Sequence, residues 1–330
     1  MRRRQFMPLA LATGALLASG QGAGAFPDKP IVLVTGYSPG GSTDILARLL
    51  ADRLAAHIGG GARIVVENRP GAAGTIASEW LRRQPADGHV LMVAESGSHA
   101  IAPNALIGGT RYHPVTDFTH LGVLSTGPLL LVVNNAFPAR TAPEAIAHLR
   151  TAPPGTLNYA TSGFGGVLHL ATEMLGQELG TRFVHVPYRS GGLMLQSIHT
   201  GETQFGIAAI ASAFAMVRDG MVRPIAVTGA ERFPLYPDIP TLMESGVPGF
   251  DIGGWYVLLG PAGMPEPIAE TINSALNAAL AEEPLRERML GSGLNPWRGP
   301  NGLAEARAFM VRELEKHRVI VERTGVRLQP

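Results

Sequence analysis

Short apolar runs alternate along the chain with longer segments whose apolar residues recur at helical spacing. The runs that predict strands cover residues 31–34, 64–66, 90–93, 129–133, 157–160, 205–207 and 225–227. Helical spacing begins near Ser42 and is found again in residues 76–83, 142–150, 167–179, 193–200, 268–281 and 304–322. Alternation of this kind is typical of an α/β fold with mostly parallel sheets.

The first strand-to-helix connection is polar and rich in glycine. It reads Tyr37-Ser38-Pro39-Gly40-Gly41-Ser42-Thr43-Asp44. Gly40 and Gly41 let the backbone turn sharply, and the free N–H groups of the next helix point into the loop. Helix N-termini bind carboxylates and phosphates through these donors and the positive end of the helix dipole. The segment therefore predicts an anion site, with an ordinary strand-to-helix turn as the alternative.

A second connection of the same kind lies near the middle of the chain. It reads Tyr159-Ala160-Thr161-Ser162-Gly163-Phe164-Gly165-Gly166 and again leads from a strand into a helix. Two such corners indicate a cleft in which each holds one side of an anionic ligand. Glycine-containing segments at 124–128 and 249–254 are candidate crossings about which two domains would swing. The alternative is that these glycines only shape a turn.

The first 25 residues have the features of an export signal. Arg2-Arg3-Arg4 precedes an apolar stretch from Met7 to Ala18, and Ala23-Gly24-Ala25 predicts cleavage after Ala25. The segment Arg3-Arg4-Gln5-Phe6-Met7 resembles a twin-arginine signal, although the basic start of an ordinary secretory signal looks similar. The apolar stretch is shorter than the ~20 residues that cross a bilayer, so we expect export and not a membrane anchor.

Composition narrows the function classes. The chain has no cysteine, which excludes disulfides and a lipid anchor on an N-terminal cysteine. Three of the 27 Lys and Arg residues lie in the signal, and the remainder balances the 26 acidic residues to within two charges. A nucleic-acid-binding face is therefore not indicated. The histidines form no H-x-H or H-E-x-x-H motif, so no metal site and no cofactor is predicted.

Catalytic signatures are mostly absent, and we do not expect an enzyme. The chain has no G-x-S-x-G elbow, no Ser-x-x-Lys pair and no G-x-x-x-x-G-K-[ST] loop, so common hydrolytic and nucleotide-binding functions lose their sequence support. The pair Ser98-His99 follows a predicted strand and leaves a hydrolase as a minor alternative. The preferred interpretation is that both residues hydrogen-bond to a ligand or to the backbone.

Eight segments occur in the order and at the spacing of one known family. They are Phe26-Pro27-Asp28-Lys29-Pro30-Ile31, Ser38-Pro39-Gly40-Gly41-Ser42-Thr43-Asp44, Val66-Glu67-Asn68-Arg69-Pro70-Gly71-Ala72-Ala73-Gly74, Pro85-Ala86-Asp87-Gly88, His99-Ala100-Ile101-Ala102-Pro103, Asn158-Tyr159-Ala160-Thr161-Ser162-Gly163, His185-Val186-Pro187-Tyr188 and Pro237-Asp238-Ile239-Pro240-Thr241. Through them the chain, from about Phe26 to its end, resembles the periplasmic solute-binding proteins of tripartite tricarboxylate transporters, the Bug family.

The resemblance implies a two-domain Venus-flytrap fold, similar to type II periplasmic binding proteins, in which each domain is a mostly parallel sheet flanked by helices. Residues 26–125 and 251–330 would form the first domain and residues 126–250 the second. A carboxylate would lie in the cleft between them, near Tyr37, Ser38, Gly40, Gly41, Ser42, Thr43, Asn68, Ser96, Ser98, His99, Thr161, Ser162, Gly163, Phe164, Gly165, His169 and Tyr188. Asp44 is expected to brace the first loop.

Two departures from the family pattern bear on the ligand. Phe164 and Gly166-Val167-Leu168 replace a polar run that relatives commonly carry, and Ala208-Ala209 lack an expected Asp or Asn. A second carboxylate would be left poorly paired, and an unmatched buried charge is costly. We therefore expect a monocarboxylate with an apolar or aromatic body, with Phe164 as a stacking face. The alternative is that Phe164 packs in the domain core.

The function implied by the resemblance is capture and delivery. The protein would bind a small carboxylate in the periplasm and present it to the membrane permease subunits of a tripartite tricarboxylate-type transporter. Presentation to a sensor kinase by an orphan binding protein is the first alternative, and a periplasmic hydrolase is the lesser one. A monomer is expected because a hinged binding protein must open freely.

Overall fold

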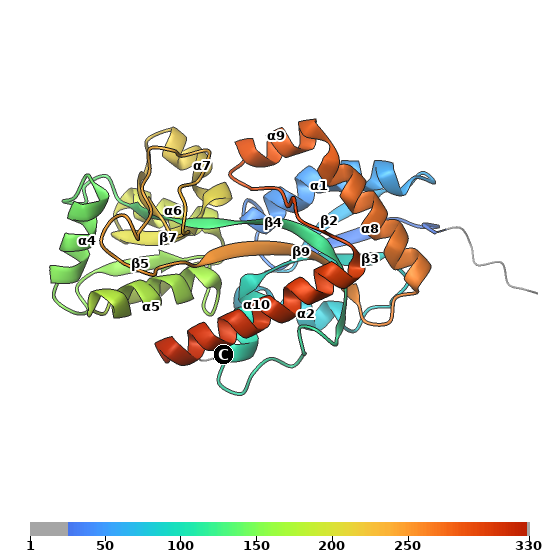
Figure 1. Ribbon diagram of the computed structural model, residues 1–330, viewed down its shortest axis with the longest axis horizontal. Helices are drawn as coiled ribbons and strands as arrows, with labels where there is room; N and C mark the ends of the chain where they lie inside the picture. The colour runs from blue at the N-terminus through green and yellow to red at the C-terminus, as the bar shows by residue number, and fades with distance from the viewer. Residues whose placement is uncertain (1–25, 329–330) are drawn as a thin grey trace, which may run out of the picture.

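The computed structural model describes residues 26–328 (Figure 1). The predicted export signal, residues 1–25, lies outside this range. Among the described residues, no helix has both the length and the apolar composition needed to cross a membrane. The molecule consists of two halves that lie side by side and are joined through the two long strands β4 and β9 at its centre.

One mixed sheet of nine strands runs through residues 26–328 in the order β2-β1-β3-β9-β4-β7-β5-β6, with β8 paired to β4 outside this path. The strands are β1 (Ile31–Thr35), β2 (Ile64–Asn68), β3 (Val90–Glu95), β4 (Phe118–Val133), β5 (Asn158–Thr161), β6 (Val184–Pro187), β7 (Phe205–Ala209), β8 (Arg223–Val227) and β9 (Gly253–Pro261). The first half contains the parallel strands β1, β2 and β3, and the second half contains the parallel strands β5, β6 and β7. Strands β4 and β9 run antiparallel to their neighbours. The predicted α/β fold is confirmed.

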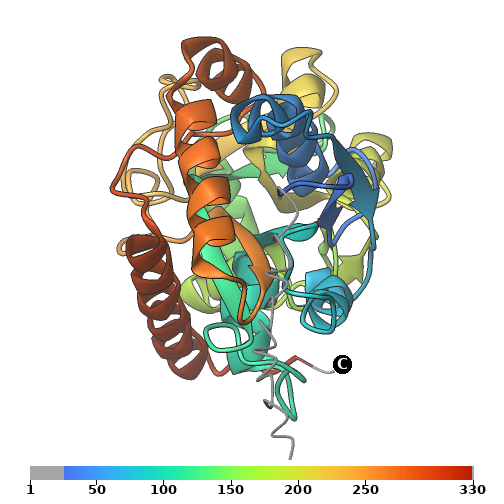
Figure 2. The ribbon, with the colours of Figure 1, turned by 90° about the vertical axis from the view of Figure 1, so that its right-hand side faces the viewer.

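Helices connect the strands and cover both faces of the sheet. They are α1 (Ser42–Ile58), η1 (Ala72–Gly74), α2 (Thr75–Leu81), η2 (Gly97–Ile101), α3 (Ala102–Ala105), α4 (Ala142–Thr151), α5 (Val167–Leu179), α6 (Gly191–Thr200), α7 (Ile210–Arg218), α8 (Glu266–Ala281), α9 (Glu283–Gly291) and α10 (Leu303–Thr324). Figure 2 shows the first half end-on, with α1, α2, α8 and α10 arranged around the strands.

Alternating side chains of the first half's strands supply its two apolar layers. Leu33 of β1 and Leu258 of β9 belong to the core cluster that includes apolar residues of α1 and α8. Val34 and Val257, one position earlier or later in the same strands, belong to the cluster that includes residues of α2 and α10. The second half has its own large cluster, which also contains Leu328 from the end of the described chain. The same cluster contains Ile101 and Ala105, and the Leu328 N–H donates to the Ala105 carbonyl oxygen at 2.9 Å, so the C-terminal end lies where the two halves meet.

The two central strands are longer than the sequence predicts. β4 was predicted only over residues 129–133, and the start of β9 was interpreted as a bend because of its glycines. In the sheet, Gly253 lies opposite Pro128 and Gly254 opposite Gly127. A Cβ atom at Gly253 would lie 2.6 Å from the Gly127 carbonyl oxygen, so the glycine permits close approach of two strands. Strands β6 and β9 and helices α7 and α9 were not predicted.

Candidate ligand-binding site

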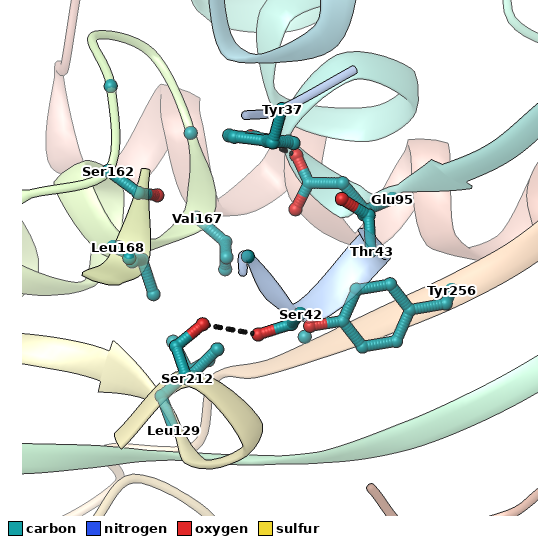
Figure 3. A pocket seen from close by; sticks show the side chains of 16 residues that line it. Tyr37, Ser42, Thr43, Glu95, Leu129, Ser162, Val167, Leu168, Ser212 and Tyr256 are labelled. Carbon is teal, nitrogen blue, oxygen red and sulfur yellow. Dashed lines mark hydrogen bonds between the residues drawn. The ribbon is translucent and has the colours of Figure 1, made fainter. Parts of the chain in front are cut away.

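A pocket lies between the two halves of the molecule, and we call it the central pocket (Figure 3). Its wall combines residues from the first half, the second half and the two crossing strands. They are Tyr37, Gly41, Ser42, Thr43, Glu95, Leu129, Ser162, Gly163, Gly166, Val167, Leu168, Gly191, Ala209, Ser212, Gly254 and Tyr256. An adjoining recess shares Tyr37, Ser162 and Gly163 with it and is otherwise lined by Gly36, Pro70, Gly71, Ala72, Ala73, Phe164, Pro187, Tyr188 and Arg189.

Four helices point their N-termini at the central pocket. Ser42 begins α1 and Val167 begins α5, and both line the wall together with the glycines that precede them. Neither Gly41 nor Gly166 provides a side-chain cap. Because the first-turn N–H groups of a helix have no intrahelical acceptor, both ends present free donors and the positive end of a dipole. The N-terminal residues of α6 and α7, represented by Gly191 and Ser212, complete the arrangement.

Within the described range, 26–328, no Lys, Arg or His lines the central pocket. An anion there would depend on backbone N–H groups, on hydroxyl groups and on helix dipoles. Leu129, Val167, Leu168 and Ala209 give the rest of the wall an apolar character. The arrangement suits a small ligand that has one anionic end and an apolar body.

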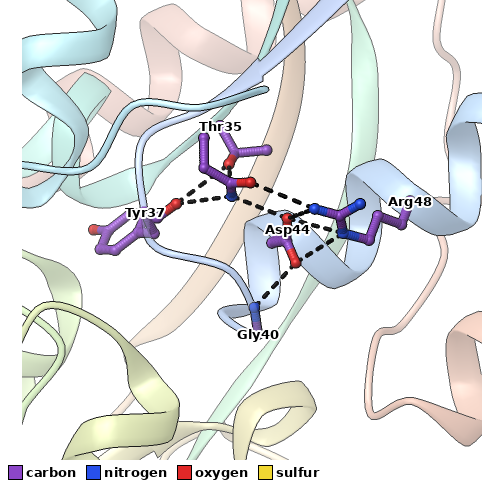
Figure 4. Close-up of polar contacts among 6 residues, drawn as sticks. Thr35, Tyr37, Gly40, Asp44 and Arg48 are labelled. Atoms are coloured by element: carbon purple, nitrogen blue, oxygen red, sulfur yellow. Dashed lines mark hydrogen bonds and ion pairs between the residues drawn. The ribbon is translucent and has the colours of Figure 1, made fainter. Parts of the chain in front are cut away.

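The first loop is held by a polar network around Asp44 (Figure 4). Asp44 Oδ2 accepts the Gly40 N–H at 3.0 Å, and Oδ1 accepts from Asn68 Nδ2 at 2.9 Å. Arg48 forms an ion pair with the same carboxylate at 2.9 Å. Burial opposes the charged form, but the hydrogen bonds from Arg48, Gly40 and Asn68 lower the pKa of Asp44. Asn68 also donates to the Tyr37 carbonyl at 3.0 Å, which ties the loop to β2.

The second loop is held by stacked rings. His169 Nδ1 accepts the Gly165 N–H at 3.3 Å, and Thr161 Oγ1 lies 2.7 Å from His185 Nε2. The rings of His169 and His185 stack with centroids 4.0 Å apart, and the Phe164 ring lies 4.8 Å from His169. Burial, followed by the neighbouring His185, lowers the pKa of His169 to about 3. Burial also lowers the pKa of His185 to about 4. Both rings are therefore neutral at pH 7.

A buried acid faces the central pocket from the end of β3. Glu95 Oε1 accepts a hydrogen bond from Tyr37 Oη at 2.6 Å. Burial raises the pKa of Glu95 to about 7, while hydrogen bonds from Tyr37 and from the N–H groups of Gly97 and Ser98 act in the opposite direction. Figure 3 shows its carboxyl group between Tyr37 and Thr43.

One hydrogen bond joins the two halves directly across the pocket. Ser42 Oγ of α1 lies 2.8 Å from Ser212 Oγ of α7. Figure 3 shows this contact below the pocket, next to Tyr256 of β9. The first and second halves are therefore in direct contact at one side of the pocket.

The structure brings some predicted site residues together and leaves others apart. Tyr37, Gly41, Ser42, Thr43, Ser162 and Gly163 line the central pocket, and Phe164 and Tyr188 line the adjoining recess. The predicted residues that line neither are Ser38, Gly40, Asn68, Ser96, Ser98, His99, Thr161, Gly165 and His169. Phe164 is 40% exposed, so the alternative that it packs in the domain core is wrong.

The Ser98–His99 pair lies outside both cavities. Ser98 Oγ is 2.9 Å from His99 Nδ1, but both side chains are fully buried. His99 packs against the ring of Phe118 with centroids 4.9 Å apart, and burial, followed by His120, lowers its pKa to about 3. A substrate has no access to this pair, and the hydrolase alternative loses its geometric basis.

Sequence reasoning missed several residues of the wall. Glu95 directly precedes the predicted Ser96, and an acid at a strand end was a signal that could have found it. Tyr256 and Leu129 lie on the long crossing strands, so their position depends on the pairing of β4 with β9. Ser212 lies in the first turn of α7, a helix whose sequence is mostly apolar and shows no clear helical periodicity.

Comparisons with known proteins support these observations. The model of a family described as tripartite tricarboxylate transporter family receptor matches residues 46–326. A protein of Pseudomonas sp. (strain P51), from the tcbD-tcbE intergenic region, is 30% identical over 309 residues, which is 92% of this chain and 90% of that protein. BugT of Bordetella pertussis is 27% identical over 313 residues, 95% of this chain and 94% of BugT.

The chain is also similar to solved structures over most of its length. A protein of R. palustris with adipate has a TM-score of 0.87 and 30% identity, and the match covers 92% of this chain and 100% of that one. The periplasmic binding protein BugD has a TM-score of 0.86 and 26% identity over 92% of this chain and 100% of its own. MatC of Rhodopseudomonas palustris with bound malate has a TM-score of 0.84 and 31% identity over 90% of this chain and 100% of MatC.

Proposed function

Because the chain belongs to the tripartite tricarboxylate transporter receptor family, we propose that it captures a small carboxylate in the central pocket and delivers it to a membrane transporter of that type. The receptors of this family bind solutes, and the similar BugD is a periplasmic binding protein. After removal of residues 1–25 the protein would act in the periplasm as a monomer. Its partner would be the permease subunits of the same system.

The convergence of helix N-termini is the observation that carries the proposal. The ends of α1 and α5 face one pocket from opposite halves, and neither has a side-chain cap. A carboxylate could accept hydrogen bonds from both ends at once, which only a closed arrangement allows. Binding would thereby favour closure of the two halves.

The proposed moving parts are the domains expected from the sequence, residues 26–125 with 251–330 and residues 126–250. Two core clusters that follow this division in most of their residues support it, with Ile101, Ala105 and the end of α10 in the second cluster and Ala211 in the first as the main exceptions. The Ser42–Ser212 contact would be made on closure and lost on opening.

A monocarboxylate with an apolar body is the ligand class that the wall supports best. The similar structures with adipate and malate hold dicarboxylates. Among the residues that the structure describes, no basic side chain lines the central pocket, and Glu95 would repel a second carboxylate. Phe164, at the adjoining recess, would contact an aromatic or aliphatic body that extends out of the central pocket.

A thermal-shift screen tests the proposal. The mature protein, unfolded and refolded to remove bound ligand, is heated with aliphatic, aromatic and polycarboxylic acids. A ligand at 100 times its dissociation constant stabilises the fold by about 2.7 kcal/mol, so the midpoint should rise by several degrees. Stabilisation by no acid would overturn carboxylate capture, and clear preference for polycarboxylates would overturn the ligand class alone.

A matched pair of variants locates the site. Ser162→Phe places a ring where the central pocket and the adjoining recess meet, so we expect at least tenfold weaker binding. Ser274→Phe makes the same change on the exposed face of α8 and should bind like the wild type. Equal binding by both variants would place the ligand elsewhere.

A further inference from the structure

Glu95 is a charged group that the proposed binding of an anion does not use. The residue is 8% exposed, and of the described side chains that line the central pocket it alone carries a carboxylate. Within residues 26–328 it forms no ion pair. Burying a carboxylate without a counter-charge is costly, so a positively charged ligand group beside it would be favoured.

The groups around Glu95 favour its charged form. Tyr37 Oη donates to Oε1 at 2.6 Å, and the N–H groups of Gly97 and Ser98 also donate to the carboxylate. A carboxylate can accept all three hydrogen bonds, whereas a neutral carboxyl group has one oxygen that donates. Burial opposes these donors and raises the pKa of Glu95 to about 7, so at pH 8 the group is mostly charged.

A second polar group in the same wall lacks a partner. Thr43 is only 3% exposed, and its Oγ1 atom has no hydrogen-bond partner within residues 26–328. Figure 3 shows Thr43 beside the Glu95 carboxyl group, on the side of the pocket that Tyr37 closes. The wall thus offers a carboxylate and a hydroxyl oxygen next to each other, which together suit a donor group with a positive charge.

The helix N-termini, in contrast to Glu95 and Thr43, suit a negatively charged group. The ends of α1 and α5 favour an anion, whereas Glu95 would repel it across a small pocket with an apolar wall, where charges are weakly screened. A ligand that carries only negative charge gains at one end and loses at the other. A ligand with separated charges of both signs gains at both.

We propose that the ligand is an amino-carboxylic acid, whose carboxylate lies at the N-termini of α1 and α5 and whose protonated amine is bound by Glu95 and Thr43. This inference rests on the proposed function and names its substrate class. Glu95 acts as a specificity-determining residue, because it selects the amine within the class of monocarboxylates with an apolar body. Net neutral ligands would thereby be preferred over simple acids of the same shape.

The test compares acids that differ only in the amine. Affinities of the ligand-free protein at pH 8 are measured by titration calorimetry for leucine and 4-methylpentanoate, phenylalanine and 3-phenylpropanoate, and 6-aminohexanoate and hexanoate. We expect at least one amine to bind tenfold or more tightly than its amine-free partner. Glu95→Gln keeps an acceptor for Tyr37 and should reduce that preference to less than twofold. Glu67→Gln removes a charge from an ion pair on β2 and should leave the preference unchanged.

The outcomes separate this inference from the proposed function. Tight binding of amine-free acids, with their amine partners no better, would overturn the amine site and leave carboxylate capture intact. An amine preference that survives Glu95→Gln would also overturn it. Binding of no acid in either series would overturn both. If Glu95→Gln does not fold, the comparison of amines with amine-free acids on the wild type still tests the amine site.

Discussion

The two glycine-rich loops that enter the central pocket present similar helix N-termini but are held by different forces. A charged network around Asp44 fixes the first loop, with Arg48 and Asn68 as partners. Neutral rings fix the second, where His169 stacks on His185 and accepts a backbone N–H. A glycine-rich loop can thus be held in place either by ionic hydrogen bonds or by aromatic packing. Different changes of residue and of pH should therefore destabilise the two loops.

Removal of the Asp44 carboxylate should have the largest effect. Asp44→Ala removes a buried carboxylate that accepts from the Gly40 N–H and from Asn68 Nδ2 and that pairs with Arg48. We expect a loss of about 3 kcal/mol in the free energy of unfolding, and weaker ligand binding as the loop loosens. Denaturant titration measures the loss in the free energy of unfolding. Asp219→Ala, which breaks an exposed ion pair with Arg218, should cost much less of the free energy of unfolding. Equal losses would contradict the bracing role of Asp44.

The second loop should be the more sensitive to mild acid. The pKa of His169 is about 3 in the fold, below its ordinary value of 6.5, so the unfolded chain binds the proton more readily. Its contribution to stability is present above pH 6.5 and is lost as the pH falls toward 3. Wild type should lose about 2 kcal/mol more than His169→Phe between pH 7 and pH 5.

The same pH series distinguishes the two loops. The pKa of Asp44 is lowered from 3.8, so its contribution is complete above that value and is lost only in stronger acid. Asp44→Asn should therefore shift the stability curve without changing its slope between pH 7 and pH 5. Parallel curves for wild type and His169→Phe would show that the ring stack does not confer the acid sensitivity.

The contact between the halves should have the smallest effect. Ser42→Ala and Ser212→Ala each remove one partner of a hydrogen bond that we assign to the closed form. A neutral hydrogen bond contributes about 1 kcal/mol, so each variant should weaken ligand binding by several fold. Ligand affinity of the double variant should be close to that of either single variant. Strictly additive losses would show that the two hydroxyl groups act independently.

The sequence predicts much of the fold and part of the site, for a local reason. Strand, glycine-rich turn and amphipathic helix follow each other within a few residues at both loops, and α5 begins and ends where predicted, between Gly166 and Gly180. Tyr37, Ser42 and Ser162 were found because they lie in these local patterns. Propensity and periodicity act over the same short range.

The remaining wall depends on long-range pairing. Tyr256 enters the pocket only because β9 pairs with β4 in one register, and the glycines at its start indicated a bend instead. Glu95 lies at the end of a predicted strand, but its burial follows from the loop that covers it, where Tyr37 donates across 58 positions of sequence. Neither contact leaves a periodic signal in the chain.

A crystal structure of the mature protein with the acid that stabilises it most would test the central claim most directly. The account predicts a carboxylate within hydrogen-bond distance of first-turn N–H groups of both α1 and α5, with no Lys or Arg side chain on it. A carboxylate held by a basic side chain, or bound to one half alone, would contradict the account.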